Sequence, residues 1–116
     1  MSAKTTKKAQ VPHAKAMNLG GLVDFAADSI VSRTLLENKA GTITLFAFDE
    51  GQGLSEHTAP FDAFVQVVEG VGQFRVGKKT VNVEQGEILV MPADIPHAVA
   101  ARQQFKMLLT MLRPRK

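Results

Sequence analysis

The chain of 116 residues contains no cysteine, no tryptophan and no tyrosine. Without cysteine it has no disulfide bond, no thiolate metal ligand and no thiol nucleophile. No apolar run approaches the roughly 18 residues that a membrane-spanning helix needs, and the first residues lack the apolar core of a secretory signal peptide. We therefore expect a cytoplasmic protein without a membrane segment.

Positive charge is concentrated at the two ends of the chain. The formal net charge is +3, but seven of the fourteen basic residues lie in the first fifteen and last four positions, so the remainder carries about −4. Basic ends can contact nucleic acid or an acidic partner. These ends hold no aromatic side chain that would stack on bases, so we expect solvated ends and no nucleic-acid binding.

The sequence divides into a short tail and one domain. Residues 1–16 are polar, basic and unpatterned, and we expect a disordered tail there. Residues 17–116 are long enough for a single core, so we expect one domain. Within it, scattered apolar residues over 17–27 are interrupted by Gly20-Gly21. That pattern predicts no more than a helical turn or an irregular segment packed on the domain.

Short runs with a period of two begin at residue 30. They are rich in β-branched and aromatic residues, and Gly, Pro, Asn and Asp separate them about every 8–12 residues. The expected strands cover 30–36, 42–48, 63–68, 73–76, 80–83, 88–91, 97–101 and 105–112. We expect the first two to pair antiparallel and 73–76 to form a hairpin with 80–83. About seven to nine such strands predict an all-β sandwich or barrel.

Two stretches of the chain combine a histidine with glycine and proline. The first contains Gly51, His57, Ala59, Ala63 and Gly70, and the second contains Gly86, Pro92, Asp94 and His97. Their spacing resembles the cupin family, whose first motif has Gly, His-x-His, Glu and Gly, and whose second has Gly, Pro-x-Gly-x-x-His. The resemblance covers roughly residues 30–112. It implies one cupin jelly-roll β-barrel.

The resemblance also implies a metal site with an incomplete ligand set. In the family, three histidines and a glutamate bind Fe, Mn, Ni, Zn or Cu for oxygenase, isomerase or decarboxylase chemistry. Here the ligand positions are occupied by His57, Ala59, Ala63 and His97, so only the two histidines can coordinate one divalent transition metal. The alternative is that both are hydrogen-bonded histidines that lend polarity to a cavity.

Apolar strand faces suggest a pocket. By analogy with the ligand glutamate, alternate residues from Ala63 onward face the interior, and flexible methionines on the last strand suit an adaptable wall. The expected pocket residues are Ala59, Ala63, Val65, Gln66, Val67, Met107 and Met111. Such a pocket would hold one small apolar or aromatic ligand. A filled core explains the same pattern.

Three functions remain open at this point, and whether the chain is an enzyme is undecided. The leading hypothesis is a small-molecule-binding barrel with a degenerate metal site. The first alternative is a metal-dependent enzyme of oxygenase or isomerase type that uses His57 and His97, and the second is a structural or interaction protein. The outward faces are also apolar, with candidates Phe64, Val68, Leu108 and Leu112. Strands apolar on both faces need cover on both, and the resemblance implies a homodimer.

Overall fold

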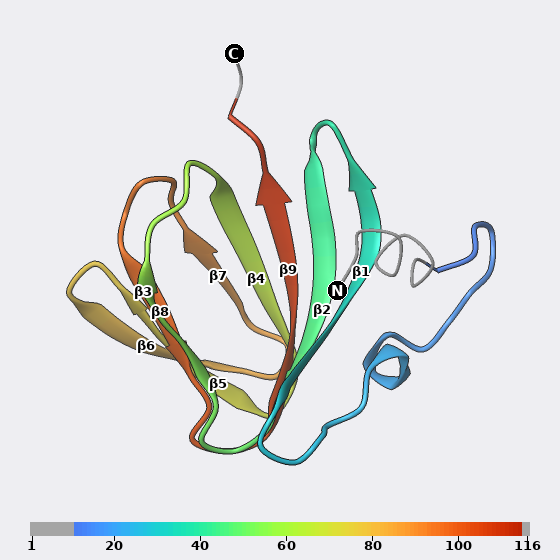
Figure 1. The fold of residues 1–116 in the computed structure, drawn as a ribbon, viewed down its shortest axis with the longest axis horizontal. Coiled ribbons are helices and arrows are strands. Elements are labelled where there is room, and N and C mark those ends of the chain that lie inside the picture. Colours follow the sequence, from blue (N-terminus) through green and yellow to red (C-terminus); the bar gives the residue numbers. More distant parts are fainter. Residues whose placement is uncertain (1–10, 115–116) are drawn as a thin grey trace.

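The computed structural model describes residues 11–114 as two antiparallel β-sheets that form a jelly roll (Figure 1). The five-stranded sheet has the order β1-β2-β9-β4-β7 and the four-stranded sheet the order β3-β8-β5-β6. The strands are β1 (Ile30–Asn38), β2 (Gly41–Phe48), β3 (Gly53–His57), β4 (Asp62–Glu69), β5 (Val71–Val76), β6 (Lys79–Glu84), β7 (Ile88–Met91), β8 (His97–Ala100) and β9 (Phe105–Leu112). This confirms the all-β jelly roll.

The predicted strand pairs form as expected. β1 pairs antiparallel with β2, with a register shift between Thr34 and Leu36. β5 and β6 form a hairpin in which Val76 pairs with Lys79, so its loop consists of Gly77 and Lys78. Gly77 has a φ of 61°, the positive value that a two-residue hairpin of type II′ needs at its first loop position. β3 is the strand that the sequence pattern does not single out.

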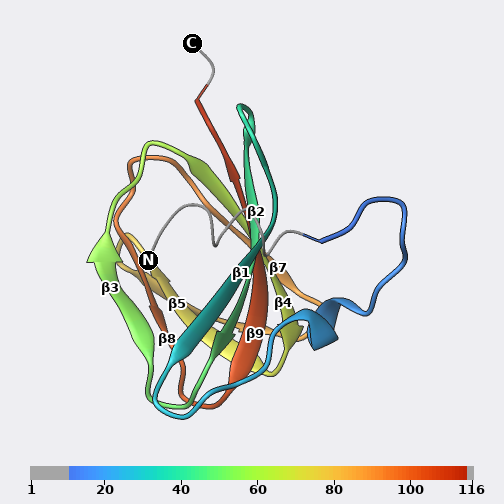
Figure 2. The same ribbon diagram turned by 45° about the vertical axis from the view of Figure 1, so that its right-hand side comes forward.

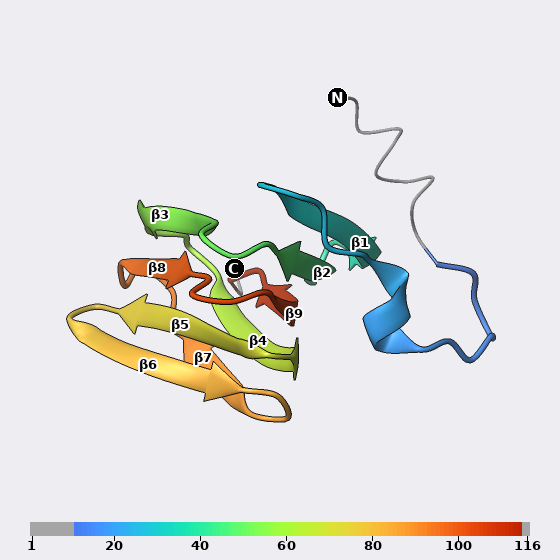
Figure 3. The same ribbon diagram turned by 90° about the horizontal axis from the view of Figure 1, so that it is seen from below.

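A short segment before β1 covers part of the outer face of the five-stranded sheet (Figures 2 and 3). It contains one 3-10 turn, η1 (Leu19–Leu22), whose Asn18 side chain accepts a hydrogen bond from the backbone of Gly21. Buried Val23 of this segment packs with Leu45 and Ala47 of β2. The expected helical turn or irregular segment is therefore confirmed. Of the predicted tail, residues 1–10 lie outside the described residues.

A buried lysine fastens this segment to the sheet. Lys106 of β9 is 7% exposed, and its Nζ donates a hydrogen bond of 2.7 Å to the carbonyl of Gly20. The same ammonium lies 5.0 Å from the ring centroid of Phe25 and 3.5 Å from Oε1 of Glu69. These partners offset the cost of removing the charge from water.

Among the described residues, no helix is long and apolar enough to cross a membrane.

The other half of this outer face carries exposed apolar side chains. Leu112 of β9 and Ile88 and Val90 of β7 are more than half exposed, at 53%, 55% and 52%. Phe64 pairs with Val90 across β4 and β7 and lies on the same face. We call Phe64, Ile88, Val90 and Leu112 the uncovered face.

The main core lies between the two sheets and is aromatic at one end. Phe48 and Phe105 stack with ring centroids 4.7 Å apart, and Phe74 meets Phe105 edge-on at 6.1 Å. All three are fully buried. Gly72 leaves room for them, because a Cβ atom there would lie 2.6 Å from the Phe105 ring. The sheets converge toward the end where β2 finishes and diverge toward the opposite end (Figure 1).

Candidate functional site

The last residue of β3 and the first residue of β8 bring the two motif histidines together at the divergent end. His57 pairs with His97 in the register of these strands. Their ring centroids are 4.4 Å apart and the rings meet edge to face, at 70°. His57 is exposed, whereas His97 is buried at 6% exposure. The sequence prediction that the two histidines converge is therefore confirmed.

Both imidazoles are held in the same tautomer. Nδ1 of His57 lies 2.8 Å from the carbonyl oxygen of Ser55, and Nδ1 of His97 lies 3.1 Å from that of Ile95. Because a carbonyl oxygen only accepts hydrogen bonds, Nδ1 must carry the proton in each neutral ring. Nε2 is then a lone-pair acceptor, and within residues 11–114 neither Nε2 receives a hydrogen bond.

A largely enclosed cavity of about 60 Å³ lies against this pair. Its remaining walls are apolar and come from both sheets and the β3–β4 loop. They are Leu54, Ala59, Phe61, Ala63, Met91, Val99, Met107, Leu109 and Met111. The two histidines are therefore the polar part of an otherwise apolar cavity.

The loops at this end are tied to each other by hydrogen bonds. The backbone N–H of Asp94 donates to the carbonyl of Ala59 at 2.8 Å, and that of Ala93 donates to Oδ1 of Asp62 at 2.9 Å. Asp94 has a φ of 65°, which explains why the family motif has glycine here: the position is left-handed, and aspartate tolerates that conformation better than most residues. The two motif loops thus frame the cavity together.

The donor set does not fit the four-ligand divalent metal site of the family. Ala59 and Ala63 line the cavity where the family has a histidine and a glutamate. The carboxylate of Asp62 accepts a hydrogen bond from the backbone N–H of Ala93, and that of Glu56 forms an ion pair with Arg75. Within residues 11–114, no three His, Cys, Asp or Glu side chains are grouped closely enough to hold a metal ion.

Of the seven predicted pocket residues, four line the cavity and three do not. Ala59, Ala63, Met107 and Met111 line the cavity, as expected. Val65 and Val67 are buried in the core, but neither lines the cavity. Gln66 is exposed and pairs with Ile88 on the outer face, which corrects its expected place in the pocket.

Sequence reasoning missed the wall supplied by β7. Met91 lines the cavity and pairs with Ala63 of β4, which also pairs with Met111 of β9 on its other side. Alternation within 88–91 puts Met91 and Leu89 on one face. It does not reveal that β7 and β4 are neighbours, so the signal was incomplete.

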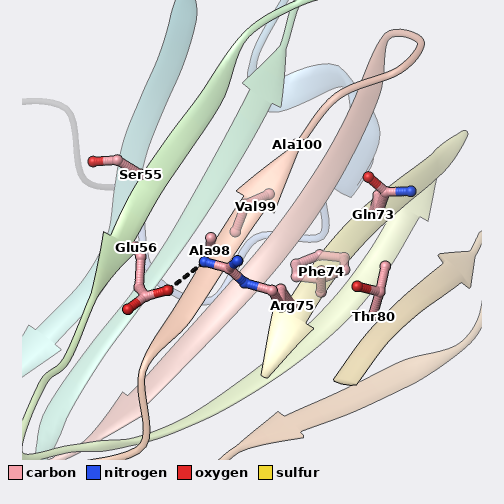
Figure 4. A pocket seen from close by; sticks show the side chains of 9 residues that line it. All are labelled: Ser55, Glu56, Gln73, Phe74, Arg75, Thr80, Ala98, Val99 and Ala100. Carbon is pink, nitrogen blue, oxygen red and sulfur yellow. Dashed lines mark hydrogen bonds and ion pairs between the residues drawn. The ribbon is translucent and has the colours of Figure 1, made fainter. Parts of the chain in front are cut away.

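A larger hollow of about 450 Å³ lies on the outer face of the four-stranded sheet (Figure 4). Its walls are Ser55, Glu56, Gln73, Phe74, Arg75, Thr80, Ala98, Val99 and Ala100. It is broadly open to solvent, and its two charged groups, Glu56 and Arg75, bind each other. Size alone is a poor guide here. The smaller cavity is more enclosed, and it is lined by two histidines whose Nε2 atoms receive no hydrogen bond from residues 11–114, so we place the candidate site there.

Comparisons with known proteins agree with this architecture. A protein of unknown function from Streptococcus pyogenes is 36% identical, with a TM-score of 0.87 over 92% of this chain and 94% of that one. A cupin 2 conserved barrel domain protein from Leptotrichia buccalis is 40% identical, with a TM-score of 0.80 over 84% of this chain and 47% of that one.

A third similar structure, an RmlC-like cupin from Desulfovibrio desulfuricans, is 31% identical, with a TM-score of 0.75 over 89% of this chain and 100% of that one. No curated protein matches the sequence. The family model described as cupin domain matches residues 44–112, which is more than half of the chain and includes both histidine motifs. The chain belongs to the cupin family.

Proposed function

We propose that this cupin is a binding protein that holds one small organic molecule through Nε2 of His57 and His97. The observation that supports the proposal most directly is the shared tautomer of the two rings. Each Nδ1 lies against a backbone carbonyl, which leaves one Nε2 acceptor on each of two neighbouring rings that line an otherwise apolar cavity. A ligand with a hydroxyl or N–H donor would satisfy them, and an acceptor on a buried side chain such as His97 is costly to leave unsatisfied.

The size of the cavity limits the ligand. A volume of 60 Å³ is about that of two water molecules, and a cavity that takes up benzene is about 150 Å³. A whole aromatic ring therefore exceeds the enclosed space. We expect a small donor group to enter the cavity while the rest of the molecule lies at its mouth, over exposed His57.

Isothermal titration calorimetry with short-chain alcohols, short-chain amines and phenol tests the proposal. At least one of these should bind, and His57→Ala or His97→Ala should weaken it by about tenfold or more, because each substitution removes one hydrogen bond between the ligand and an imidazole. His13→Ala is the matched control, since His13 is exposed and does not line the cavity. Equal binding by all four proteins would contradict the role of the histidines.

A metal-dependent enzyme is the second candidate, and one observation favours it. Metal-binding histidines usually donate their other ring N–H to a carbonyl or carboxylate, and both histidines here do so. Water or substrate would have to complete the coordination shell of one divalent ion. Elemental analysis of untagged protein purified without metal resin tests this candidate. Near-stoichiometric metal that disappears in His57→Ala and His97→Ala would support it, and metal-free protein would contradict it.

We also propose a homodimer that buries the uncovered face of Phe64, Ile88, Val90 and Leu112. Among residues 11–114, the segment before β1 packs on the other half of this outer face and leaves these side chains exposed or half-buried. A second copy would remove the exposed side chains from water. Sedimentation equilibrium should find a dimer that Val90→Lys converts to a monomer, whereas Thr80→Lys on the other sheet should not. A wild-type monomer would refute the dimer.

A further inference from the structure

We propose that the same cavity is a Cu(I) site in which Nε2 of His57 and His97 is joined by the thioether sulfurs of Met91 and Met111. This goes beyond organic-ligand binding and does not rest on it. The two occupants would compete for the same two nitrogens. Cu(I) loading would therefore block the site for an organic ligand.

Methionines are concentrated at this cavity. The chain has five methionines, and Met91, Met107 and Met111 all line the one cavity that the histidine pair lines. Thioether sulfur is a soft ligand that selects Cu(I) over the hard divalent ions. A cavity wall of this kind is commonly just flexible packing. Here the three methionines share their cavity with two histidines, which can supply nitrogen ligands beside the sulfurs.

Strand register places two of these methionines where the family has its carboxylate ligand. Ala63 stands at the glutamate position, and it pairs with Met91 of β7 on one side and with Met111 of β9 on the other. Neighbouring strands are about 4.8 Å apart, so both methionines start within one strand spacing of the missing carboxylate. The small Ala63 side chain leaves the space between them open. Met107 pairs with Val67, four residues farther along β4, and is therefore the more remote of the three.

Charge also favours a monovalent ion. Among residues 11–114, no carboxylate lines the cavity, so these residues would not neutralise a divalent ion there. The cost of transferring an ion from water to a medium of low dielectric constant rises with the square of its charge, so a single charge costs about a quarter as much as a double one. Cu(I) also accepts low coordination numbers. Two imidazoles and one or two thioethers suffice for it.

Anaerobic competition with the chromophoric chelator bicinchoninate tests the inference on untagged, metal-free protein. We expect the wild-type protein to withdraw about one equivalent of Cu(I) from the chelator. The double variant Met91→Leu with Met111→Leu should bind Cu(I) about tenfold to hundredfold more weakly, with Zn(II) affinity unchanged. Met17→Leu is the matched control, because Met17 lies outside the cavity. Failure to withdraw Cu(I), or equal affinity in the double variant, overturns the proposal.

A second measurement on the unmutated chain guards against a variant that fails to fold. With carbon-13 in the methionine methyl groups, NMR should show the Met91 and Met111 signals shifting on addition of Ag(I), a redox-stable substitute for Cu(I), while the Met17 signal stays in place. Unshifted Met91 and Met111 signals overturn the proposal. Organic-ligand binding is unaffected by either negative result, because it needs the histidines and not the sulfurs. Loss of organic binding in His57→Ala together with intact Cu(I) binding would instead refute the shared site.

Discussion

The two ends of this jelly roll are built from the same two sheets but are filled differently. At the convergent end, Phe48, Phe74 and Phe105 pack against one another between the sheets and are fully buried. At the divergent end, two histidines and three methionines surround a cavity. Tight packing and open space are thus separated along the strands: one end supplies buried aromatic area, and the other keeps a cavity lined by two histidines.

Removal of an aromatic ring at the convergent end should have the largest effect on the free energy of unfolding. Phe105→Ala removes the ring that contacts both Phe48 and Phe74, so the free energy of unfolding should fall by about 3–5 kcal/mol. Urea denaturation followed by circular dichroism measures the loss. Phe61→Ala at the hollow end is the control, because Phe61 is only partly buried and already borders empty space. A loss for Phe61→Ala as large as that for Phe105→Ala would mean that both ends carry the core.

Metal ligands added at the divergent end should create a binding site for a divalent metal ion. The double variant Ala59→His with Ala63→Glu supplies the two missing ligand types at positions that line the cavity. Zn(II) affinity should rise about hundredfold, since a carboxylate both coordinates the ion and neutralises part of its charge. Titration against a Zn(II) indicator measures the gain.

The matched control for this gain is Ala59→His with Ala63→Gln, which has nearly the same shape without the charge. It should gain far less Zn(II) affinity. Equal affinity in the two double variants would show that charge is not what the cavity lacks, and the argument for a monovalent ion would then fail.

Most of the fold follows from the sequence because its determinants are local. Alternation places most of the strands and Gly77 closes a hairpin, whereas the meeting of His57 with His97 follows from the resemblance of their two stretches to the cupin motifs. The missed wall residue, Met91, depends on β7 lying beside β4, which is set by the fold as a whole. Gln66 is a different case. A period of two already puts Gln66 on the face of the strand opposite to that of Ala63. The expectation that Gln66 lines the pocket therefore contradicted the same alternation that predicted the strand.

Side chains enlarged by one or two methyl groups should distinguish the two ends. Gly72→Ala brings a Cβ atom 2.6 Å from the Phe105 ring and 2.8 Å from the Phe74 ring, so it should cost about 1–3 kcal/mol through overpacking. Ala63→Val adds two methyl groups beside the cavity and should leave the free energy of unfolding unchanged or raise it slightly. Thermal and urea denaturation of both variants provide the test. Destabilisation of similar size at both positions would show that the divergent end is as tightly packed as the other.

The smallest expected effect concerns a carboxylate beside the aromatic end. Asp49 directly follows Phe48, and its Oδ2 accepts a hydrogen bond of 2.7 Å from the backbone N–H of Asp28, while its Oδ1 accepts one of 2.9 Å from the side chain of Gln104. These hydrogen bonds, that from Asp28 foremost, hold the pKa of Asp49 below its ordinary value of 3.8. The Asp49 carboxylate therefore ties the start of β1 to the loop before β9.

The direction of its pH dependence follows from linkage. A carboxyl whose pKa is lower in the folded chain stabilises it fully above the unfolded pKa, and the contribution disappears as the pH falls through the folded pKa. Asp49→Asn should therefore be less stable than wild type at neutral pH, by a gap that narrows as the pH drops below 3.8. The control is Asp24→Asn, which removes another exposed carboxylate from the segment before β1. Urea midpoints measured from about pH 2 to 7 decide the matter. At low pH, protonated Asp49 lacks the charge that makes these hydrogen bonds strong, just as an asparagine does, so a stability difference caused by the charge must shrink. A stability difference of constant size from about pH 2 to 7 would therefore mean that Asp49 acts through its shape and not through its charge.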